Sequence, residues 1–533
     1  MRAGDGTRAA LARDRRAVVV VVLGLLGVYL LTMAGHTTSV DGESYMMGTR
    51  ALLHHTTVLA PTPDIDDIII PVVHKNGGLT TLAPIGSLLL FSPGAVAGTI
   101  VSRMFPAASR EEVFRLIYLS ANSVLTALTA GVLLLLCRAL GARLRTASLL
   151  ALVYGLGTWA WAHAQSDFTE PGTALMLTAA MLGSLAWWRV PTARRAATVG
   201  LLAGCVVLTR ASALLFVPVL MVVGVTVPGL TTRARLQHVA AFVAGGIAPM
   251  IAFSVNSWLR FGELFDNGYS NLPYSTPVYE GVFGLLFSTG KGIVFYAPVC
   301  IVVVFGARLS YLANRRYAIT VGLLLVAHLS VYSRFKVWSG ENSYGPRYMF
   351  PLLPVVIALL APIIDSGRQW VRGVKAAGFI GFAVPGLLGT LMYFNGVSWA
   401  QRDHVLHDYA ITELSIDQTY DAWHFVPRES PLMQAIRSVP DLVRNTVDRI
   451  EGEPGGIEPI PAEYEQRIGW YGATIQLDTW WAWWSARGGP AAGYLFLLVP
   501  LGCLTVAARL GAQMLPRWRR RIEARQSRSI VTA

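Results

Sequence analysis

The feature that most limits the fold of this chain is a series of apolar runs, each close to the length of a membrane span. A spanning helix needs about 20 mainly apolar residues. Only 14% of the 533 residues are charged and 53% are hydrophobic, whereas soluble domains have about 25% charged residues. The sequence therefore predicts an all-α polytopic membrane protein. The expected spans are roughly 16–36, 113–137, 146–163, 171–188, 196–209, 211–228, 239–258, 290–308, 317–334, 348–364, 375–395 and 490–511.

The net charge of +13 does not indicate a nucleic-acid-binding protein. The basic residues lie in short clusters between apolar runs, where the cytoplasmic loops of membrane proteins carry them. The four cysteines lie in or at the ends of apolar runs and suggest neither a disulfide nor a metal site. No cofactor is predicted, although the sequence is compatible with a divalent metal. The first run lacks a small-residue cleavage site and is interpreted as a retained first helix.

One further apolar segment, 79–101, is ambiguous because it contains Pro84, Pro93 and several glycines. Whether it crosses the membrane decides the sidedness of every later loop. If it does not cross and the N-terminus is inside, all the internal basic clusters face the cytoplasm, as the positive-inside rule favours. We therefore expect 79–101 to lie along the outer surface or to dip in and return. The internal clusters are Arg138/Arg143/Arg145, Arg189/Arg194/Arg195, Arg233/Arg235, Arg308/Arg315/Arg316 and Arg368/Arg372/Lys375.

This layout gives about twelve spans in the plasma (inner) membrane, with both termini cytoplasmic. It divides the chain into a transmembrane module at 1–395, an extracytoplasmic region at 396–489, and a last span with a basic tail at 490–533. The first outer loop, about 37–112, is expected to contain juxtamembrane helices. The cytoplasmic loops are short and carry little besides charge, so any chemistry is expected on the extracytoplasmic face.

Acidic residues lie at the outer ends of several predicted spans, where carboxylates are costly. The stretch "TSVDGESYMMGTRALLHH" places Asp41 and Glu43 directly after the first span. It is interpreted as a short helix, in which Asp41 could simply be the N-cap. The short loop "HAQSDFTEPG" adds Asp167 and Glu170 on the same side. Asp167 could also be a plain N-cap, but together these acids suggest a shared polar cavity.

Basic residues on the same predicted side could bind an anion. Lys291 stands between two glycines at a helix start, which favours anions, although it could equally be a snorkelling interfacial lysine. Arg347 enters a span from outside, against the usual bias, and a guanidinium can bind phosphate in a bidentate way. The other candidates are Arg210, expected to pair with Asp167 or Glu170, together with Tyr344, His74 and Lys75.

The acidic pair closing the first span, the following short helix and surface segment, and the acidic exit of the third span resemble the GT-C glycosyltransferases. The resemblance is narrower to the group of protein O-mannosyltransferases and lipid A aminoarabinose transferases, a family 39-like group. It is also carried by "RFGELFDNGYSNLP", "GLLFSTGKGIVFYAP" and "SYGPRYMFPLLP" and covers about residues 15–365. It implies a GT-C-like bundle and transfer of a sugar from a polyprenyl-phosphate-sugar donor on the outer face.

The resemblance also implies roles for individual residues. Asp41 matches the catalytic acidic position, where a carboxylate takes the proton of the acceptor hydroxyl. Glu43 matches a less constant position, and Asp167 matches a second acidic position that binds acceptor or sugar. Lys291 and Arg347 fall where basic groups would bind the leaving phosphate. The chain departs from the pattern at Gly42, which separates two acids that many members have side by side, and in the reduced surface motif "LAPIGSLLL".

The implied partners are the lipid-linked sugar, membrane lipids and a glycan, lipid or protein acceptor from the cell envelope. The main alternative is a transporter or flippase of a lipid-linked or small polar substrate. Transporters commonly have internal repeats and charges near the midplane, and neither is visible here. In the outer region, "DTWWAWWSARGGP" is interpreted as an aromatic belt at the headgroups, with a sugar-stacking surface as the alternative.

Overall fold

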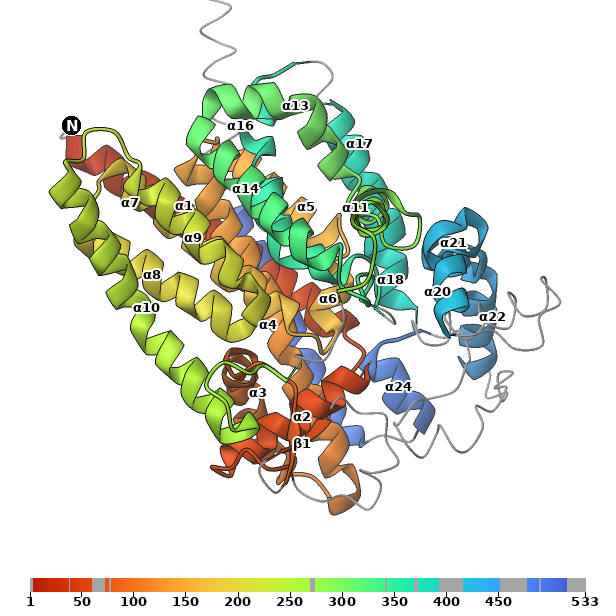
Figure 1. Ribbon diagram of the computed structural model, residues 1–533. Helices are drawn as coiled ribbons and strands as arrows, with labels where there is room; N and C mark the ends of the chain where they lie inside the picture. Colours follow the sequence, from red (N-terminus) through yellow and green to blue (C-terminus); the bar gives the residue numbers. More distant parts are fainter. Residues whose placement is uncertain are drawn as a thin grey trace, which may run out of the picture.

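The computed structural model describes residues 3–37, 39–59, 72–75, 78–268, 274–340, 343–368, 372–392, 416–450, 477–487 and 490–514. These residues form a helical, polytopic bundle (Figure 1). The described strands are β1 (Val72–Lys75) and β2 (Gly78–Thr81), which pair antiparallel with Val72 opposite Thr81. The all-α class predicted from the apolar runs is therefore confirmed.

Within the described residues, every predicted span falls on one helix or on consecutive helices; residues 393–395 of the span at 375–395 lie outside them. The spans that consist of one helix each are α1 (Ala3–Thr32), α4 (Arg110–Ala139), α7 (Glu170–Arg189), α8 (Ala193–Thr209), α10 (Thr232–Phe261) and α14 (Arg315–Tyr332). The other spans are divided into consecutive helices. Pairs of helices make up four of them: α5 (Leu144–Leu156) with α6 (Ala160–Gln165), η2 (Ala211–Leu215) with α9 (Phe216–Val225), α12 (Ile293–Tyr296) with α13 (Val299–Ala313), and η7 (Ala491–Leu497) with α25 (Leu498–Ala512). Three helices make up each of the remaining two: η3 (Arg347–Leu352), α15 (Leu353–Ile357) and α16 (Leu360–Asp365), and α17 (Arg372–Gly381), η5 (Phe382–Gly386) and α18 (Leu387–Leu391).

Prolines explain several of these interruptions, because proline lacks a backbone N–H and clashes with the preceding turn. Pro298 separates α12 from α13, Pro351 lies within the 3₁₀ helix η3, and Pro385 lies within the π-helical turn η5. The predicted continuous spans at 290–308, 348–364 and 375–395 are therefore segmented helices.

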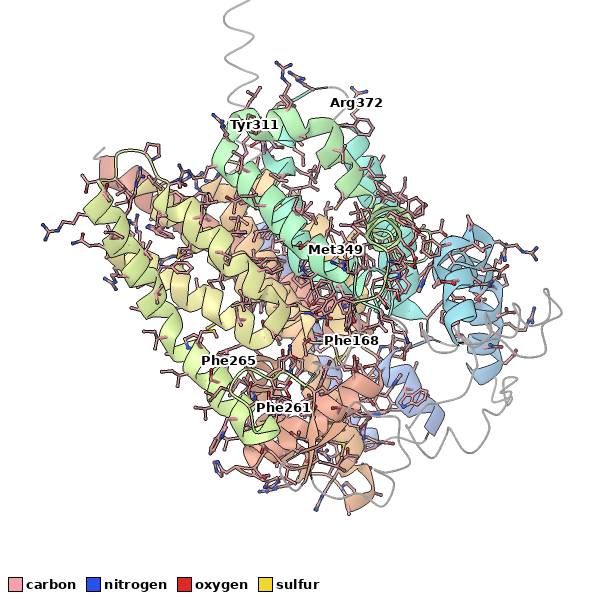
Figure 2. All side chains as sticks on the ribbon, viewed as in Figure 1. Phe168, Phe261, Phe265, Tyr311, Met349 and Arg372 are labelled. Carbon is pink, nitrogen blue, oxygen red and sulfur yellow. The ribbon has the colours of Figure 1, made fainter. Side chains whose placement is uncertain are left out.

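The loops that carry the internal basic clusters gather at one end of the bundle. Arg138 Nε lies 3.0 Å from Asp14 Oδ2, so the start of α1 meets the end of α4. The Asp365 carboxylate accepts from the backbone N of Arg143 at 2.8 Å, and the Asn314 amide donates to the carbonyl of Leu140 at 3.3 Å. Figure 2 shows Tyr311 and Arg372 at this end, while Phe261 and Phe265 lie at the other. The alternation of helix ends matches the predicted layout.

The helix α3 (Ile85–Ser102) is one of seven described helices that are long and apolar enough to cross a membrane. It contacts the bundle helices α4, α7 and α8. The Ser87 hydroxyl donates to the carbonyl of Thr209, the last residue of α8, at 3.2 Å. A Cβ at Gly98 would lie 3.0 Å from the carbonyl oxygen of Phe114, near the start of α4, and one at Gly172, near the start of α7, would lie 2.7 Å from Leu90.

The helix α3 therefore packs along the first turns of α4 and reaches the start of α7 and the end of α8, and Figure 1 shows it nearly end-on while α8 and α10 run across the picture. The expectation that 79–101 does not cross stays a prediction, since α3 is long and apolar enough to span a membrane. The helix α2 (Val40–Leu53) packs beside it at the same end. Together with η1 (Ala107–Ser109), these are the helices expected in the first outer loop.

Between α18 and η7 the structure describes α20 (Ile416–Phe425), η6 (Pro427–Glu429), α21 (Pro431–Arg437), α22 (Val439–Ile450) and α24 (Trp480–Arg487). The tryptophans of α24 do not form the predicted belt. Trp480, Trp483 and Trp484 are buried in a cluster with residues of α2, α3 and α4. The aromatic-belt interpretation is wrong for these three side chains.

The gathering of the basic loops predicts which end faces the cytoplasm. Ala108 in η1 and Ala193 at the start of α8 are both exposed and lie at opposite ends of the bundle. In a variant without the four native cysteines, Ala108→Cys should react with a membrane-impermeant thiol reagent in intact cells, whereas Ala193→Cys should react only after permeabilisation. The reverse pattern would contradict the layout.

Candidate active site at one end of the bundle

The site is built around the end of α1, which α24 covers. A helix end leaves four carbonyl groups without intrahelical partners. The indole N–H groups of Trp480 and Trp481 donate to the carbonyls of Leu30 and Leu31, at 2.9 and 2.8 Å. The backbone N of Trp480 donates to the carbonyl of Met33 at 2.8 Å. The chain therefore leaves α1 along a fixed path.

A buried contact between a histidine and a carboxylate holds the next turn. His36 Nε2 lies 2.7 Å from Asp478 Oδ1, and both side chains are almost completely buried. Burial lowers the pKa of His36, but the charge and hydrogen bond of Asp478 outweigh it and raise the pKa above its ordinary value. A buried charge needs such a partner. The pair therefore joins the segment after α1 to the segment before α24.

The helix α2 begins at a cap that the sequence did not single out. Its N-cap is Ser39, whose hydroxyl accepts from the backbone N of Gly42 at 2.9 Å. The interpretation of Asp41 as a simple cap is therefore wrong, and its carboxylate is available for other contacts. Asp167 supports the same turn, because it accepts from the backbone N of Ser39 at 3.1 Å and from its hydroxyl at 2.7 Å.

No side chain fits at position 42, because Asp167 occupies the space. A Cβ at this position would lie 1.9 Å from Asp167 Oδ2, which is far inside van der Waals contact. The glycine between the two acids of "DGES" thus lets α2 pack directly on the carboxylate that holds its N-cap. Asp167 is buried, so the structure gives it a positioning contact. Its predicted role toward substrate stays a prediction.

Glu43 is neutralised by an arginine that the sequence analysis did not select. Arg115, near the start of α4, forms an ion pair with both carboxylate oxygens, and the Thr37 hydroxyl donates to Glu43 as well. The signal that singled out Arg347, an arginine at the predicted outer end of a span, applies equally to Arg115. Glu43 is therefore tied to the side of the site and turned toward α4.

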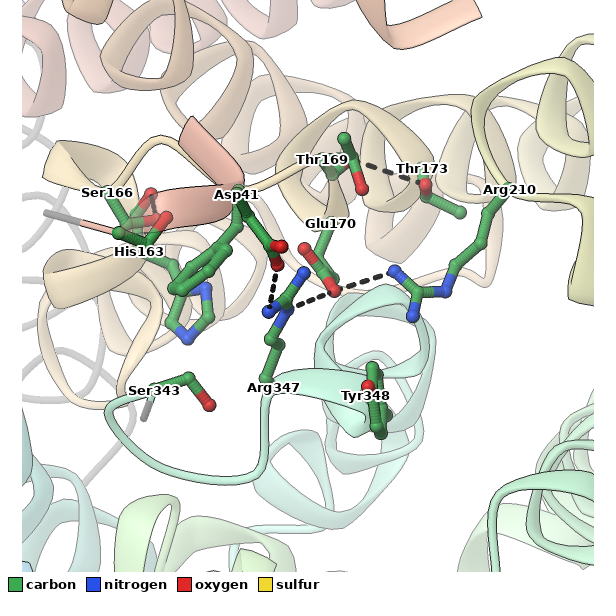
Figure 3. A network of polar contacts seen from close by, with 12 residues as sticks. Asp41, His163, Ser166, Thr169, Glu170, Thr173, Arg210, Ser343, Arg347 and Tyr348 are labelled. Carbon is green, nitrogen blue, oxygen red and sulfur yellow. Dashed lines mark hydrogen bonds and ion pairs between the residues drawn. The ribbon is translucent and has the colours of Figure 1, made fainter. Parts of the chain in front are cut away.

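The remaining acids and arginines form a four-residue ion-pair network (Figure 3). Glu170 Oε1 accepts from Arg210 Nη1 at 2.6 Å and from Arg347 Nε at 2.8 Å. Arg347 Nη1 lies 2.7 Å from Asp41 Oδ2. Of the two acids expected as partners of Arg210, Asp167 and Glu170, the structure shows Glu170. Two negative and two positive groups give the network a formal charge of zero.

Aromatic rings fix both guanidinium groups. The Arg347 guanidinium lies 3.9 Å from the centroid of the Phe168 ring, and that of Arg210 lies 4.9 Å from the centroid of the Tyr348 ring. Such cation–π contacts are favourable, more so where water is excluded. Both arginines are thus held at one edge by Glu170 and over a ring on one face.

The four acids of the site differ in exposure. The side chain of Asp41 is 22% exposed, that of Glu43 is 12% exposed and that of Glu170 is fully buried. Asp167 is also buried, at 3% exposure of the residue. Within the described part of the chain, the one ion pair of Asp41 is with Arg347. Asp41 is therefore the acid best placed to meet a molecule from outside.

Lys291 lies behind the network and contacts the loop before Arg347. It is 2% exposed, and its ammonium donates to the backbone carbonyl of Ser343 and, at 3.2 Å, to the Ser343 hydroxyl. His163 Nε2 donates to the carbonyl of Tyr344 in the same loop at 3.1 Å, and Tyr344 itself is buried against the ring of Tyr296. The snorkelling alternative is wrong, because the Lys291 ammonium points into the protein.

The structure does not place every predicted residue at this site. His74 and Lys75 lie on β1, where they pair with Leu79 and Gly78, but their side chains are outside the described part. Among the residues described, no group of three or more His, Cys, Asp or Glu is arranged to hold a metal ion. The site as described can offer one accessible carboxylate beside two arginines.

The packing of Gly42 on Asp167 predicts a large effect of a single methyl group. Gly42→Ala should lower the thermal stability of the purified protein, because overpacking a filled site costs about 1–3 kcal/mol. Gly322→Ala, in α14, is the matched control, since a Cβ there meets no atom within 4 Å. Equal melting temperatures for the two variants would contradict the close contact at Gly42.

No protein-family model matches this chain, and no curated protein matches it. Among solved structures, it is similar to ArnT from Cupriavidus metallidurans bound to undecaprenyl phosphate, with 16% identity and a TM-score of 0.47 over 94% of this chain and 79% of that one. ArnT in the apo state gives 16% identity and 0.44 over 95% and 78%. An Archaeoglobus fulgidus oligosaccharyltransferase tethered with an acceptor peptide gives 11% identity and 0.41 over 79% and 63%.

Proposed function

We propose that this protein is an integral-membrane glycosyltransferase of the GT-C type. It transfers a sugar from a polyprenyl-phosphate-sugar donor to a cell-envelope glycan, lipid or protein. The observation that carries the proposal is the position of Asp41. It is the most exposed of the four acids, lies at the end of the first crossing, and is paired with an arginine at the same level.

Asp41 supplies the general base in this proposal. A base must come within hydrogen-bonding reach of the proton that it removes. All four carboxylates have partners, but the other three are less exposed than Asp41: Glu43 is held by Arg115, Asp167 by Ser39, and Glu170 by two arginines. Asp41 therefore takes the proton of the acceptor hydroxyl as its oxygen attacks the anomeric carbon.

The arginines supply the phosphate site. Arginine binds phosphate through a planar fork that remains charged at every physiological pH. Arg347 and Arg210 lie on either side of Glu170, and their side chains are 10% and 16% exposed. Lys291 acts behind them, because its ammonium fixes the 343–347 loop that carries Arg347. We thus assign the leaving phosphate to Arg347 first and Arg210 second.

The location of the site suits a lipid-linked donor. The network lies at the end of the bundle opposite the basic loops, which we assign to the extracytoplasmic face by the positive-inside rule. A polyprenyl chain remains among the lipid tails while its phosphate stays at headgroup level. A base that acts on the attached sugar must lie at that same depth, and the exit of the first span provides it.

Replacing the base should abolish transfer while leaving the fold intact. Loss of general-base assistance typically lowers a rate by about 10²–10⁴-fold, so Asp41→Asn should lose nearly all turnover. Glu43→Gln should lose less, because Glu43 is tied to Arg115. Turnover would be measured with purified variants and a radiolabelled polyprenyl-phosphate sugar. If Asp41→Asn kept more than half of the wild-type rate, Asp41 would not be the base.

Replacing Arg347 should weaken donor binding in graded steps. A hydrogen bond to a charged group contributes about 1.5–3 kcal/mol, so Arg347→Ala should bind donor roughly ten- to a hundredfold more weakly. Arg347→Lys keeps the charge without the fork and should fall between. Titration of the detergent-solubilised proteins with a short-chain polyprenyl-phosphate sugar would measure this, with acceptor affinity as the control. Equal donor affinity in all three proteins would leave Arg347 a structural residue only.

A further inference from the structure

We propose that Arg347 is shared between Asp41 and the donor phosphate, and that proton transfer to Asp41 shifts its ion pair onto the leaving phosphate. This inference rests on the proposed function. It adds a coupling between the two halves of the reaction, the removal of the acceptor proton and the departure of the phosphate. The ion pair of Arg347 with Asp41 and the anchoring of its opposite edge by Glu170 carry the argument.

The two contacts of Arg347 lie on different nitrogen atoms. Its Nε donates to Glu170, which is completely buried and is also held by Arg210. Its Nη1 pairs with Asp41, which is partly exposed. Because the Nε contact is enclosed and the guanidinium rests on Phe168, that edge is fixed. The Nη1 contact, at the exposed side, is the one that an incoming anion can replace.

The charges before and after the reaction fit this exchange. The donor is a phosphodiester with one negative charge, and Asp41 carries another. The acceptor oxygen forms a bond to the anomeric carbon, and the bond from that carbon to the phosphate oxygen breaks. Its electron pair goes to the phosphate, which becomes a dianion near neutral pH, and the acceptor proton goes to Asp41, which becomes neutral. One negative charge has thus moved from Asp41 to the phosphate.

Arg347 is the residue that can follow this charge. In the resting site its Nη1 is neutralised by Asp41, so it binds a phosphate less strongly than a free arginine does. Once Asp41 is protonated, Nη1 is released as the phosphate gains charge. An interaction that is stronger in the transition state than in the ground state lowers the barrier. When Asp41 later loses its proton, the pair re-forms and favours release of the polyprenyl phosphate.

The test measures binding of a short-chain polyprenyl monophosphate, which requires no turnover. Asp41→Asn removes the competing charge and should bind this product at least about tenfold more tightly than wild type, the change expected for one charge-assisted contact. Asp41→Ala should show the same gain and serves if the amide variant folds poorly. Combining Asp41→Asn with Arg347→Gln should remove the gain, since the released arginine is its cause.

Glu111→Gln is the matched control for charge alone. Glu111 lies at the same end of the bundle and pairs with Arg50 and Arg115, not with Arg347. Its replacement removes the same charge and should leave the affinity unchanged. An equal gain in Glu111→Gln, a gain that persists without Arg347, or no gain in either Asp41 variant would each overturn the coupling. If wild type and all variants failed to bind polyprenyl phosphate, the proposed function itself would be contradicted.

Discussion

The arrangement of the site depends on one buried carboxylate, Glu170. Its side chain is fully enclosed, and an enclosed charge is costly unless it is paired and hydrogen-bonded. Arg210 and Arg347 meet this requirement at 2.6 and 2.8 Å. Glu170 begins α7, Arg210 directly follows α8, and Arg347 begins η3, so one carboxylate fixes the relative positions of three segments. The position of Arg347 in turn sets where Asp41 finds its partner.

A second set of contacts brings Asp41 to that partner. The indoles of α24 and the pair between His36 and Asp478 fix the exit of α1. Asp167 then holds the N-cap of α2, and Gly42 allows the close approach. These contacts fix the backbone around Asp41, while its own carboxylate remains partly exposed. A fixed backbone with a partly exposed carboxylate suits Asp41, because in the proposed reaction this carboxylate exchanges its ion pair for a proton.

The sequence was sufficient to predict the spans, the clustering of the paired acids and arginines at one end of the bundle, and a pairing of Arg210 with either Asp167 or Glu170, of which the structure shows Glu170. These follow from hydrophobicity and from the cost of a charge near lipid, which act locally. The pairing of His36 with Asp478 was not predictable, because 441 residues separate them and nothing local to either one signals the other. The tryptophans were misassigned for a similar reason, since an aromatic residue near a membrane suits either a lipid-facing belt or a buried cap. The paired acids and arginines lie together at one end of the bundle and not near its middle, which favours an enzyme over the transporter alternative, where midplane charges are expected.

The most direct test of this account is to incubate the purified protein with a panel of radiolabelled polyprenyl-phosphate sugars and a membrane extract as the source of acceptors. The account predicts that at least one donor is consumed, with release of polyprenyl phosphate and transfer of label to another molecule, and that Asp41→Asn abolishes both. Donor consumption that is equally fast in the Asp41→Asn variant, or no consumption of any donor by the wild-type protein, would contradict it.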